Sequence, residues 1–326
     1  MKQVNITNYG TAEVLTLIET DIPTPGPGQI LIEVKAAGVN FSDILRRRNT
    51  YFMPTPLPYV LGAEAVGNIV ELGEGVGAPF VKGAQVLAIL PSGGAYSQYV
   101  VAQAEYCVPL PPNMDPKAAS AIFVQGSTAH LMVEQLAGDL TEKTVLVHAG
   151  AGGVGSILIQ LGKRKGAKVI ATASSEKKLA YAKSLGADLA INYSTEDWPE
   201  RLIEENGGEK VDLIFEMVGG DIYTQSFRCL NTFGKIIVYG AASGKKGLIH
   251  SEHFVDESHQ LMSFNLAHFI QFKTGEWQAS LGAMIQLIAS EQINISDIHV
   301  YTLDEVAKAH QDIENRLTVG KVTLVP

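Results

Sequence analysis

The chain has 326 residues, 46% of them hydrophobic, and its 34 acidic side chains outnumber 25 basic ones to give a net charge of −9. This composition predicts a globular protein with two domains. The acidic balance argues against a nucleic-acid partner. The only two cysteines, Cys107 and Cys229, lie far apart and in no paired motif, which argues against a disulfide framework and a thiolate metal site. The first residues lack the apolar core of a signal peptide and no apolar run is long enough to span a bilayer, so we expect a cytoplasmic protein without membrane association.

The first third of the chain is rich in short apolar runs separated by turn residues. Ile30, Ile32 and Val34 alternate along one such run, as in a strand with one buried face. This part therefore predicts a barrel-like β domain, with strands at 30–35, 66–72, 85–90 and 96–101. Residues 115–138 then show a helical pattern.

From Thr144 onward, strand and helix patterns alternate. Such alternation predicts a doubly wound parallel sheet. The expected strands are 144–148, 168–173, 189–192, 211–216, 235–239 and about 260–265. An amphipathic helix follows around 281–288, a capping box at Thr302 and Glu305 opens a last helix, and 321–325 is expected to be a strand.

A glycine-rich turn follows the first of these strands. Residues 150–155 read Gly-Ala-Gly-Gly-Val-Gly, and a helix from about Val154 and a second strand complete a βαβ unit. In such a turn, one glycine permits the tight bend, one lets the backbone approach a pyrophosphate, and one lets the helix pack on the strand. The helix N-terminus then faces the phosphate charge, which predicts a dinucleotide site.

The end of the second strand indicates which dinucleotide is bound. A NAD-selective unit carries an acidic residue there, whereas this chain has Ser174 and Ser175, with Lys178 one helical turn later. Hydroxyls and an ammonium suit a 2′-phosphate, so NADPH is favoured over NADH. Glu176 lies close by, and we interpret it as a first-turn helix residue favoured by the helix dipole.

Several motifs, in order along the chain, resemble the zinc-independent quinone oxidoreductases of the medium-chain dehydrogenase/reductase superfamily. The motifs that carry the resemblance are residues 37–43 (AGVNFSD), 61–67 (LGAEAVG), 125–129 (QGSTA), 149–155 (AGAGGVG) and 316–321 (RLTVGK). The resemblance implies a GroES-like catalytic domain at 1–123, a Rossmann NADPH-binding domain at 124–265, and a return segment at 266–326 that completes the catalytic domain. It also implies an active site in the cleft between the domains and a homodimer joined through the nucleotide domains.

The resemblance also bears on metal binding. Zinc-bearing relatives have a cysteine where this chain has Asn40 and a histidine where it has Ala63, and neither replacement is a workable zinc ligand. Glu64 remains and is expected to pair or hydrogen-bond in a structural role. We therefore expect no metal.

Four residues are candidates for the acceptor site. Asn40 is expected to donate a hydrogen bond to the acceptor oxygen or to the nicotinamide ribose, and Tyr51 offers a phenol. Asp43 and Arg47 are expected to frame the same cleft, although an ion pair without contact to substrate explains them as well. For Tyr51 the alternative is a surface aromatic in the stretch 49–58.

The resemblance assigns further residues to the cofactor. Thr128 is expected near the nicotinamide, Arg316 is expected to reach back from the C-terminal segment, and Tyr193 is expected near the adenine. The remaining cofactor-binding residues are Asn40 with its alternative bond to the nicotinamide ribose, Gly152, Gly153 and Val154 at the pyrophosphate, Ser174, Ser175 and Lys178 at the 2′-phosphate, Val218, Gly219, Tyr239, Gly240 and Ala241 along the groove, and Phe264, Asn265 and Leu266 over the nicotinamide.

Three functions follow from these observations. The first is an NADPH-dependent, metal-free quinone reductase, because a quinone delocalises the charge that arrives with a hydride and needs no Lewis acid. The second is an enone or enoyl double-bond reductase, since the loops that shape the acceptor pocket do not distinguish the two. The third, from another class, is an NADPH-binding structural or RNA-interacting protein with vestigial activity; the acidic balance disfavours RNA, and cofactor binding without turnover would support the structural form.

Overall fold

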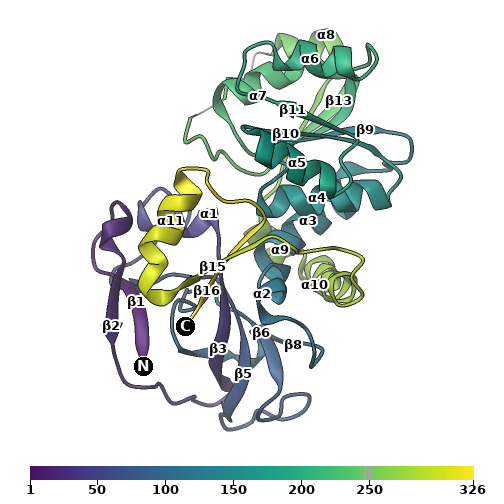
Figure 1. Ribbon diagram of the computed structural model, residues 1–326. Helices are drawn as coiled ribbons and strands as arrows, with labels where there is room; N and C mark the ends of the chain where they lie inside the picture. The colour runs from purple at the N-terminus through teal and green to yellow at the C-terminus, as the bar shows by residue number, and fades with distance from the viewer. Residues whose placement is uncertain (246, 249–250) are drawn as a thin grey trace. The chain divides into compact units, whose positions relative to one another are not determined.

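The structure is a computed structural model that describes residues 1–245, 247–248 and 251–326. The chain divides into two compact units, coloured in sequence order in Figure 1. The first unit contains residues 1–124 and 285–326, and the second contains residues 125–284. Residues 266–284, which the sequence analysis assigned to the return segment, thus cluster with the second unit.

The first unit is built mainly of antiparallel β structure. A small sheet has the strand order β2-β1-β4, and a larger sheet has the order β15-β16-β3-β5-β6-β8, with β7 also paired to β3. The strands are β1 (Lys2–Ile6), β2 (Thr16–Glu19), β3 (Gln29–Val39), β4 (Tyr59–Val60), β5 (Glu64–Leu72), β6 (Gln85–Ile89), β7 (Tyr99–Gln103), β8 (Cys107–Pro109), β15 (Ile298–Thr302) and β16 (Lys321–Val325).

Strand β3 is the centre of the larger sheet because its apolar side chains are buried along its length. Ile30 and Ile32 have no exposed surface, and Val34 is 4% exposed. The C-terminal strand β16 pairs with the end of β3, with Val322 opposite Val39. This pairing brings residues from the two ends of the sequence to the point where β3 gives way to α1 (Phe41–Arg47), and α11 (Val306–Glu314) lies beside α1 (Figure 1).

A run of short helices leads from the first unit into the second. It consists of α2 (Pro116–Ala119), η3 (Ile122–Gly126), α3 (Ser127–Leu131) and η4 (Met132–Ala137), and both η3 and η4 are π-helical. The helical pattern expected at 115–138 is therefore confirmed, with wider turns than an α-helix has. π-Helical turns are uncommon and often occur at functional sites.

The second unit contains a parallel sheet in the order β11-β10-β9-β12-β13-β14. Successive strands run outward from β9 in one direction and then from β12 in the other, which is the doubly wound topology of dinucleotide-binding proteins. The strands are β9 (Thr144–Val147), β10 (Lys168–Ala173), β11 (Leu189–Asn192), β12 (Val211–Glu216), β13 (Leu230–Val238) and β14 (Gln260–Ser263). The expected fold class is thus confirmed.

Helices cover both faces of this sheet. In Figure 1, α4 (Gly153–Arg164) and α5 (Glu176–Ser184) lie on one face, and α6 (Trp198–Glu205), α7 (Gly220–Ser226) and α8 (Glu252–Glu257) on the other. Trp198 is fully buried in the core against the sheet. The unit also contains α9 (Leu266–Phe272) and most of α10 (Thr274–Ala289). Within the described residues, no helix combines the length and apolar character needed to cross a membrane.

Most element boundaries fall within a few residues of the expected ones. Strand β13 begins at Leu230, five residues before the expected start, because Leu230 already pairs with Val211; the register is irregular from there to Lys235, and Phe233 has a φ of 63°. The expected strand 96–101 is shifted to β7, which begins at Tyr99. The capping box of Thr302 and Glu305 is confirmed, although it first opens a 3-10 turn, η6 (Leu303–Glu305), before α11.

Candidate functional site

The predicted cofactor residues of the second unit lie along one edge of its sheet. In a parallel sheet the carboxyl ends of all strands meet at the same edge, where ligands of open α/β sheets bind. The glycine-rich turn follows β9, Ser174 follows β10, and Tyr193 follows β11. On the other side, the remaining groups follow the ends of the next strands: Val218 and Gly219 after β12, Tyr239, Gly240 and Ala241 after β13, and Phe264, Asn265 and Leu266 after β14.

The glycine-rich turn depends on close approach more than on left-handed backbone. Ala149, which precedes its glycines, has a φ of 50°, and Gly152 has a φ of −82° as the N-cap of α4. A Cβ on Gly155 would lie 2.4 Å from the Ala149 carbonyl oxygen, so this glycine is required for close packing of helix and strand. Helix α4 begins at Gly153, and its first N–H groups are those that an α-helix leaves without an internal acceptor.

Gln125 is a neighbour of this turn that the sequence analysis did not assign to the cofactor site. A Cβ on Gly153 would lie 2.2 Å from the Gln125 Nε2, so the side-chain amide of Gln125 packs directly over the turn. Within this unit, a side chain added at Gly153 would therefore collide first with the side chain of Gln125. The QGSTA motif contained the signal, since it begins with this glutamine.

The end of β10 has the local structure that the phosphate prediction requires. Ser175 is the exposed N-cap residue of α5, Ser174 is half-buried, and Lys178 lies in the first turns of the helix. Glu176 is the first residue of α5, which confirms its interpretation as a first-turn residue. The Tyr193 N–H donates to the Ala173 carbonyl at 3.2 Å, so the adenine candidate lies beside the serines.

Glu216, at the end of β12, holds the next segment of this edge. Its Oε1 accepts hydrogen bonds from the backbone N–H groups of Val218 at 2.7 Å and Gly219 at 2.9 Å. Its Oε2 is buried and has no hydrogen-bond partner among the described residues. Burial raises the pKa of this carboxyl to about 7, against the lowering effect of the two N–H groups. Glu216 was not among the residues predicted from the sequence, although it directly precedes the Met217-Val218-Gly219 segment.

The nicotinamide-side candidates occupy helix starts. Asn265 is the N-cap of α9, where its side chain accepts from the Ala267 N–H at 3.0 Å, and Phe264 stacks on Phe269 with ring centroids 5.2 Å apart. Thr128 lies in α3 and is 7% exposed. Arg316 belongs to the first unit, where it is exposed and has a φ of 59°.

In the first unit, Asn40 lies at the junction of β3 and α1. It is the N-cap of α1, and its backbone N–H donates to Asp43 Oδ2 at 2.9 Å. Its side-chain Nδ2 donates to Glu64 Oε1 at 2.8 Å, and the Lys321 Nζ lies 2.8 Å from the same oxygen. Glu64 thus forms the structural pairing expected of it, with a partner at the far end of the sequence.

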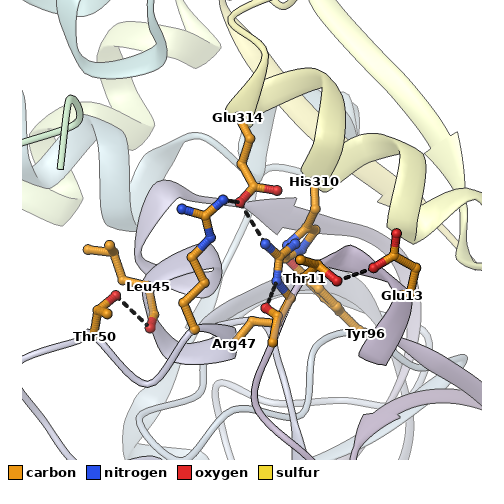
Figure 2. A network of polar contacts seen from close by, with 10 residues as sticks. Thr11, Glu13, Leu45, Arg47, Thr50, Tyr96, His310 and Glu314 are labelled. Carbon is orange, nitrogen blue, oxygen red and sulfur yellow. Dashed lines mark hydrogen bonds and ion pairs between the residues drawn. The ribbon is translucent and has the colours of Figure 1, made fainter.

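Asp43 and Arg47 belong to a second buried network, of which Figure 2 shows Arg47, Tyr96, His310 and Glu314. Arg47 has no exposed surface; it donates to the Gly10 carbonyl, to His310 Nδ1 at 3.3 Å and to Glu314 at 2.6 Å. Because a guanidinium only donates, His310 must be the neutral tautomer with its proton on Nε2. That nitrogen lies 3.1 Å from the Tyr96 hydroxyl, which in turn donates to Asp43.

This network changes the acidity of its members. Burial, assisted by the charge of Arg47, lowers the pKa of His310 to about 3. Burial raises the pKa of Asp43 to about 6, and the hydrogen bonds from Asn40 N and the Tyr96 hydroxyl oppose the rise. Arg47 and Asp43 are therefore interior residues that support α1. The side-chain amide of Asn40 belongs to the other network, where it donates to Glu64.

Tyr51 lies in the loop after α1 with a neighbour that sequence reasoning missed. The Arg46 guanidinium lies over the Tyr51 ring at 4.4 Å and reaches the Tyr59 ring at 5.8 Å. Burial raises the pKa of the Tyr51 phenol, so at neutral pH it remains a hydrogen-bond donor. Phe52, next to it, is 58% exposed and gives this loop an apolar surface.

Comparison with known proteins places these features in a family. Residues 26–112 match the alcohol dehydrogenase GroES-like domain family, and residues 153–290 match the zinc-binding dehydrogenase family. A probable quinone oxidoreductase of Schizosaccharomyces pombe is 32% identical over 99% of this chain and 96% of its own length. A 2-haloacrylate reductase of a Burkholderia species is 32% identical over 94% of both chains.

Solved structures agree with the sequence comparison. The crystal structure of Escherichia coli quinone oxidoreductase complexed with NADPH superposes with a TM-score of 0.92 and covers 100% of both chains at 31% identity. In this chain the GroES-like match precedes the zinc-binding dehydrogenase match, and the superposition covers both. The chain therefore belongs to the quinone oxidoreductase group of the medium-chain dehydrogenase/reductase superfamily and is an enzyme of the oxidoreductase type.

Proposed function

We propose that this chain is an NADPH-dependent reductase that transfers a hydride to quinones without a metal ion. The observation that carries the proposal is the carboxyl edge of the second unit's sheet, where a glycine turn at a helix N-terminus lies next to Ser174, Ser175 and Lys178. The E. coli relative that superposes over its whole length is a complex with NADPH. Relatives at this level of identity include quinone oxidoreductases.

The residues along this edge each receive a part of the cofactor in this proposal. The N–H groups at Gly152, Gly153 and Val154 bind the pyrophosphate, and the serines with Lys178 bind the 2′-phosphate. Tyr193 packs near the adenine. The groove is lined by Val218, Gly219, Tyr239, Gly240 and Ala241, with Phe264, Asn265 and Leu266 at the nicotinamide. The contacts of Thr128, Asn40 and Arg316 with the cofactor stay predictions.

The first unit does not offer a zinc site at the position that the family name implies. Catalytic zinc needs three protein ligands with free lone pairs. Asn40 presents an N–H to Glu64, Ala63 has no donor atom, and Glu64 Oε1 is already 2.8 Å from the Lys321 ammonium. A metal ion there would face a buried cation, so these residues do not fit zinc. No cluster of three His, Cys, Asp or Glu side chains suited to a metal occurs among the described residues either.

Without a Lewis acid, the acceptor must tolerate the arriving charge. Bound NADPH supplies the hydride, which together with one proton from water converts a quinone into a hydroquinone and leaves NADP⁺. Asn40 has a second side-chain N–H besides the one bonded to Glu64, and we assign it to the acceptor oxygen. Tyr51 supplies a protonated phenol beside it. Asp43 and Arg47 act through the position of α1 and not through contact with the acceptor.

A conjugated enone is the second candidate acceptor. A 2-haloacrylate reductase matches 94% of this chain, and a solved structure of a 2-haloacrylate reductase superposes with a TM-score of 0.81; an acrylate contains a conjugated carbon–carbon double bond. An enone also delocalises the charge of an added hydride, so the same residues serve both acceptors. The loop at 49–58, with its exposed Phe52, is where the two pockets would differ.

The deciding experiment measures NADPH oxidation by chelator-treated protein with an ortho-quinone and a simple enone in parallel. We expect turnover of the quinone, faster with NADPH than with NADH, and no loss of activity after chelation. Preferential turnover of the enone would replace the quinone assignment. Loss of activity that zinc restores would contradict the metal-free proposal, and tight NADPH binding with no turnover of either acceptor would favour a non-catalytic role.

We further propose a homodimer joined through the nucleotide-binding units. In the described part of the chain, β14 ends the sheet order and so offers unpaired backbone groups on its outer side. Leu261 on this strand is 38% exposed, and Phe233 on the adjacent β13 is 70% exposed. Light scattering at micromolar concentration tests the assembly, and replacing Leu261 by lysine should yield monomers. A monomeric wild-type protein would contradict the proposal.

A further inference from the structure

The Glu64 carboxylate is buried and receives three hydrogen-bond donors. Lys321 Nζ and Asn40 Nδ2 each lie 2.8 Å from its Oε1, and the Val124 N–H donates to its Oε2 at 2.9 Å. Glu64 has no exposed surface and Lys321 is 1% exposed. The pair therefore joins the start of β5, the start of β16 and the end of the first unit at Val124 in one closed cluster.

Gly38 shows how tightly this cluster is built. A Cβ on Gly38 would lie 2.2 Å from Glu64 Oε1 and 2.6 Å from Lys321 Nζ. The ion pair thus fills the space above the β3 backbone, two residues before Asn40. Any side chain at position 38 would therefore have to displace the Glu64 carboxylate and the Lys321 ammonium.

The three groups around Glu64 are all donors. An ammonium, a side-chain amide N–H and a backbone N–H all require acceptors, and a carboxylate offers acceptors on both oxygens. The Asn40 amide must therefore turn its nitrogen toward Glu64. Because the amide group is planar, this contact also sets the direction of its second N–H.

We propose that the Lys321–Glu64 ion pair is a positioning device that fixes the Asn40 amide for its contact with the acceptor oxygen. Lys321 balances the buried charge that Glu64 needs in order to hold the amide nitrogen. Asn40 remains the residue that contacts the acceptor, and Glu64 and Lys321 act through it. This inference rests on the proposed function, because it explains how the donor assigned to the acceptor is oriented.

The main test replaces both charges while keeping the side-chain volumes. In the double variant Glu64→Gln/Lys321→Met, the NH₂ group of the glutamine must face either the Val124 N–H or Asn40. If it faces Asn40, it favours an Asn40 amide turned over so that its oxygen, and not its nitrogen, points at position 64. We expect kcat with a quinone to fall by about 10- to 100-fold, as for loss of one oriented donor, with the Kd for NADPH changed by less than about twofold.

Gly38→Ala provides an independent variant that alters no charge. The added methyl group displaces the pair and with it Asn40, so kcat should again fall while NADPH affinity is kept. The matched control is Lys235→Met in the second unit. Lys235 is a half-buried lysine that donates to the Leu136 and Ala137 carbonyl oxygens, so its loss removes comparable bonds without affecting Asn40, and kcat should be unchanged.

A second measurement separates this inference from the proposed function. Hydrogen exchange of the Asn40 side-chain NH₂, observed by NMR with ¹⁵N-asparagine and assigned by its loss in Asn40→Ser, reports the amide without substrate. We expect slow exchange in the wild type and in Lys235→Met, and fast exchange in the double variant. This result would support positioning even if quinones were not turned over.

Two outcomes would overturn the inference. One is an Asn40 NH₂ that exchanges in the wild type as fast as an exposed asparagine. The other is a folded double variant or Gly38→Ala variant, less stable than the wild type but with an unchanged kcat on the acceptor that the wild type reduces. That result would mean that the ion pair only stabilises the first unit.

Discussion

The two units hold their candidate site residues in different ways. In the second unit, backbone groups and small residues at the ends of adjacent parallel strands form the cofactor edge. In the first unit, buried charged side chains from distant segments surround Asn40, and Lys321 lies 257 residues away from Glu64 in the sequence. A phosphate-binding edge thus follows from local chain geometry, whereas the orientation of a single amide depends on long-range electrostatics.

Two buried glutamates make this difference concrete. Both have no exposed surface, but Glu64 receives donors on both oxygens, one of them a lysine ammonium. Glu216 receives two backbone N–H groups on one oxygen and leaves the other without a partner among the described residues. The charge of the Glu64 carboxylate is balanced by the Lys321 ammonium. The charge of an ionised Glu216 would be stabilised only by two N–H groups on one of its oxygens.

The largest expected effect comes from removing the cation in the first unit. Lys321→Met leaves the Glu64 carboxylate buried and uncompensated, so the free energy of unfolding should fall by about 3–5 kcal/mol in urea titrations at pH 7. The control is Lys163→Met, which removes an ion pair with Asp188 whose side chains are 36% and 37% exposed. That variant should lose less than about 1 kcal/mol. Equal losses for the two variants would contradict the contrast.

The second prediction concerns Glu216→Gln and has the opposite sign. The folded pKa of about 7 lies above the ordinary value of 4.5, so the carboxyl costs stability progressively as pH rises from 4.5 through 7. A glutamine keeps the acceptor for Val218 and Gly219 and puts an uncharged NH₂ where Oε2 is. Its free energy of unfolding at pH 8 should exceed that of the wild type by about 2–3 kcal/mol, with little difference at pH 5.

Destabilisation of Glu216→Gln at both pH values would show that Oε2 has an essential partner. The matching Glu64→Gln variant should be destabilised at pH 8, because each of its two oxygens accepts from a donor. Comparing the two substitutions under the same conditions therefore tests whether the units differ in how they hold a buried carboxylate.

The third prediction tests the cofactor edge by one charge. Lys178→Ala should weaken NADPH binding by about 1.5–3 kcal/mol, the contribution of a hydrogen bond to a charged group, and leave NADH binding nearly unchanged. Fluorescence titration with both cofactors measures the difference. Equal losses for NADPH and NADH would remove Lys178 from the 2′-phosphate site, and Lys177→Ala on the same helix is the control.

The difference between the units also explains what the sequence could predict. The glycine turn, the serines after β10 and the strand ends were recognisable because each lies within a few residues of its partners. Glu216 was missed because its two hydrogen bonds from the Val218 and Gly219 N–H groups depend on the bend of the chain after β12, which no motif encodes. The Lys321–Glu64 pair and the Arg47–His310–Tyr96 chain were beyond local reasoning, since only the pairing of β16 with β3 and the packing of α11 bring these residues together.

The smallest expected effect is on the pH dependence of stability, to which buried histidines and buried carboxyls contribute with opposite signs. Burial lowers the pKa of His148 and of His310 to about 3, so both groups contribute stability above their ordinary pKa of 6.5 that is lost as pH falls. Asp43 and Glu216, with folded pKa values of about 6 and 7, gain stability over the same interval as they take up protons. Between pH 7 and pH 5 a histidine with these pKa values costs about 2 kcal/mol, and Glu216 returns about 2 kcal/mol. The free energy of unfolding of Glu216→Gln, which lacks this compensating group, should therefore fall by about 2 kcal/mol more than that of the wild type on acidification. Because both tryptophans, Trp198 and Trp277, lie in the second unit, their fluorescence follows the unit that contains Glu216 and His148. An equal change in the wild type and the variant would mean that Glu216 does not take up a proton in this interval.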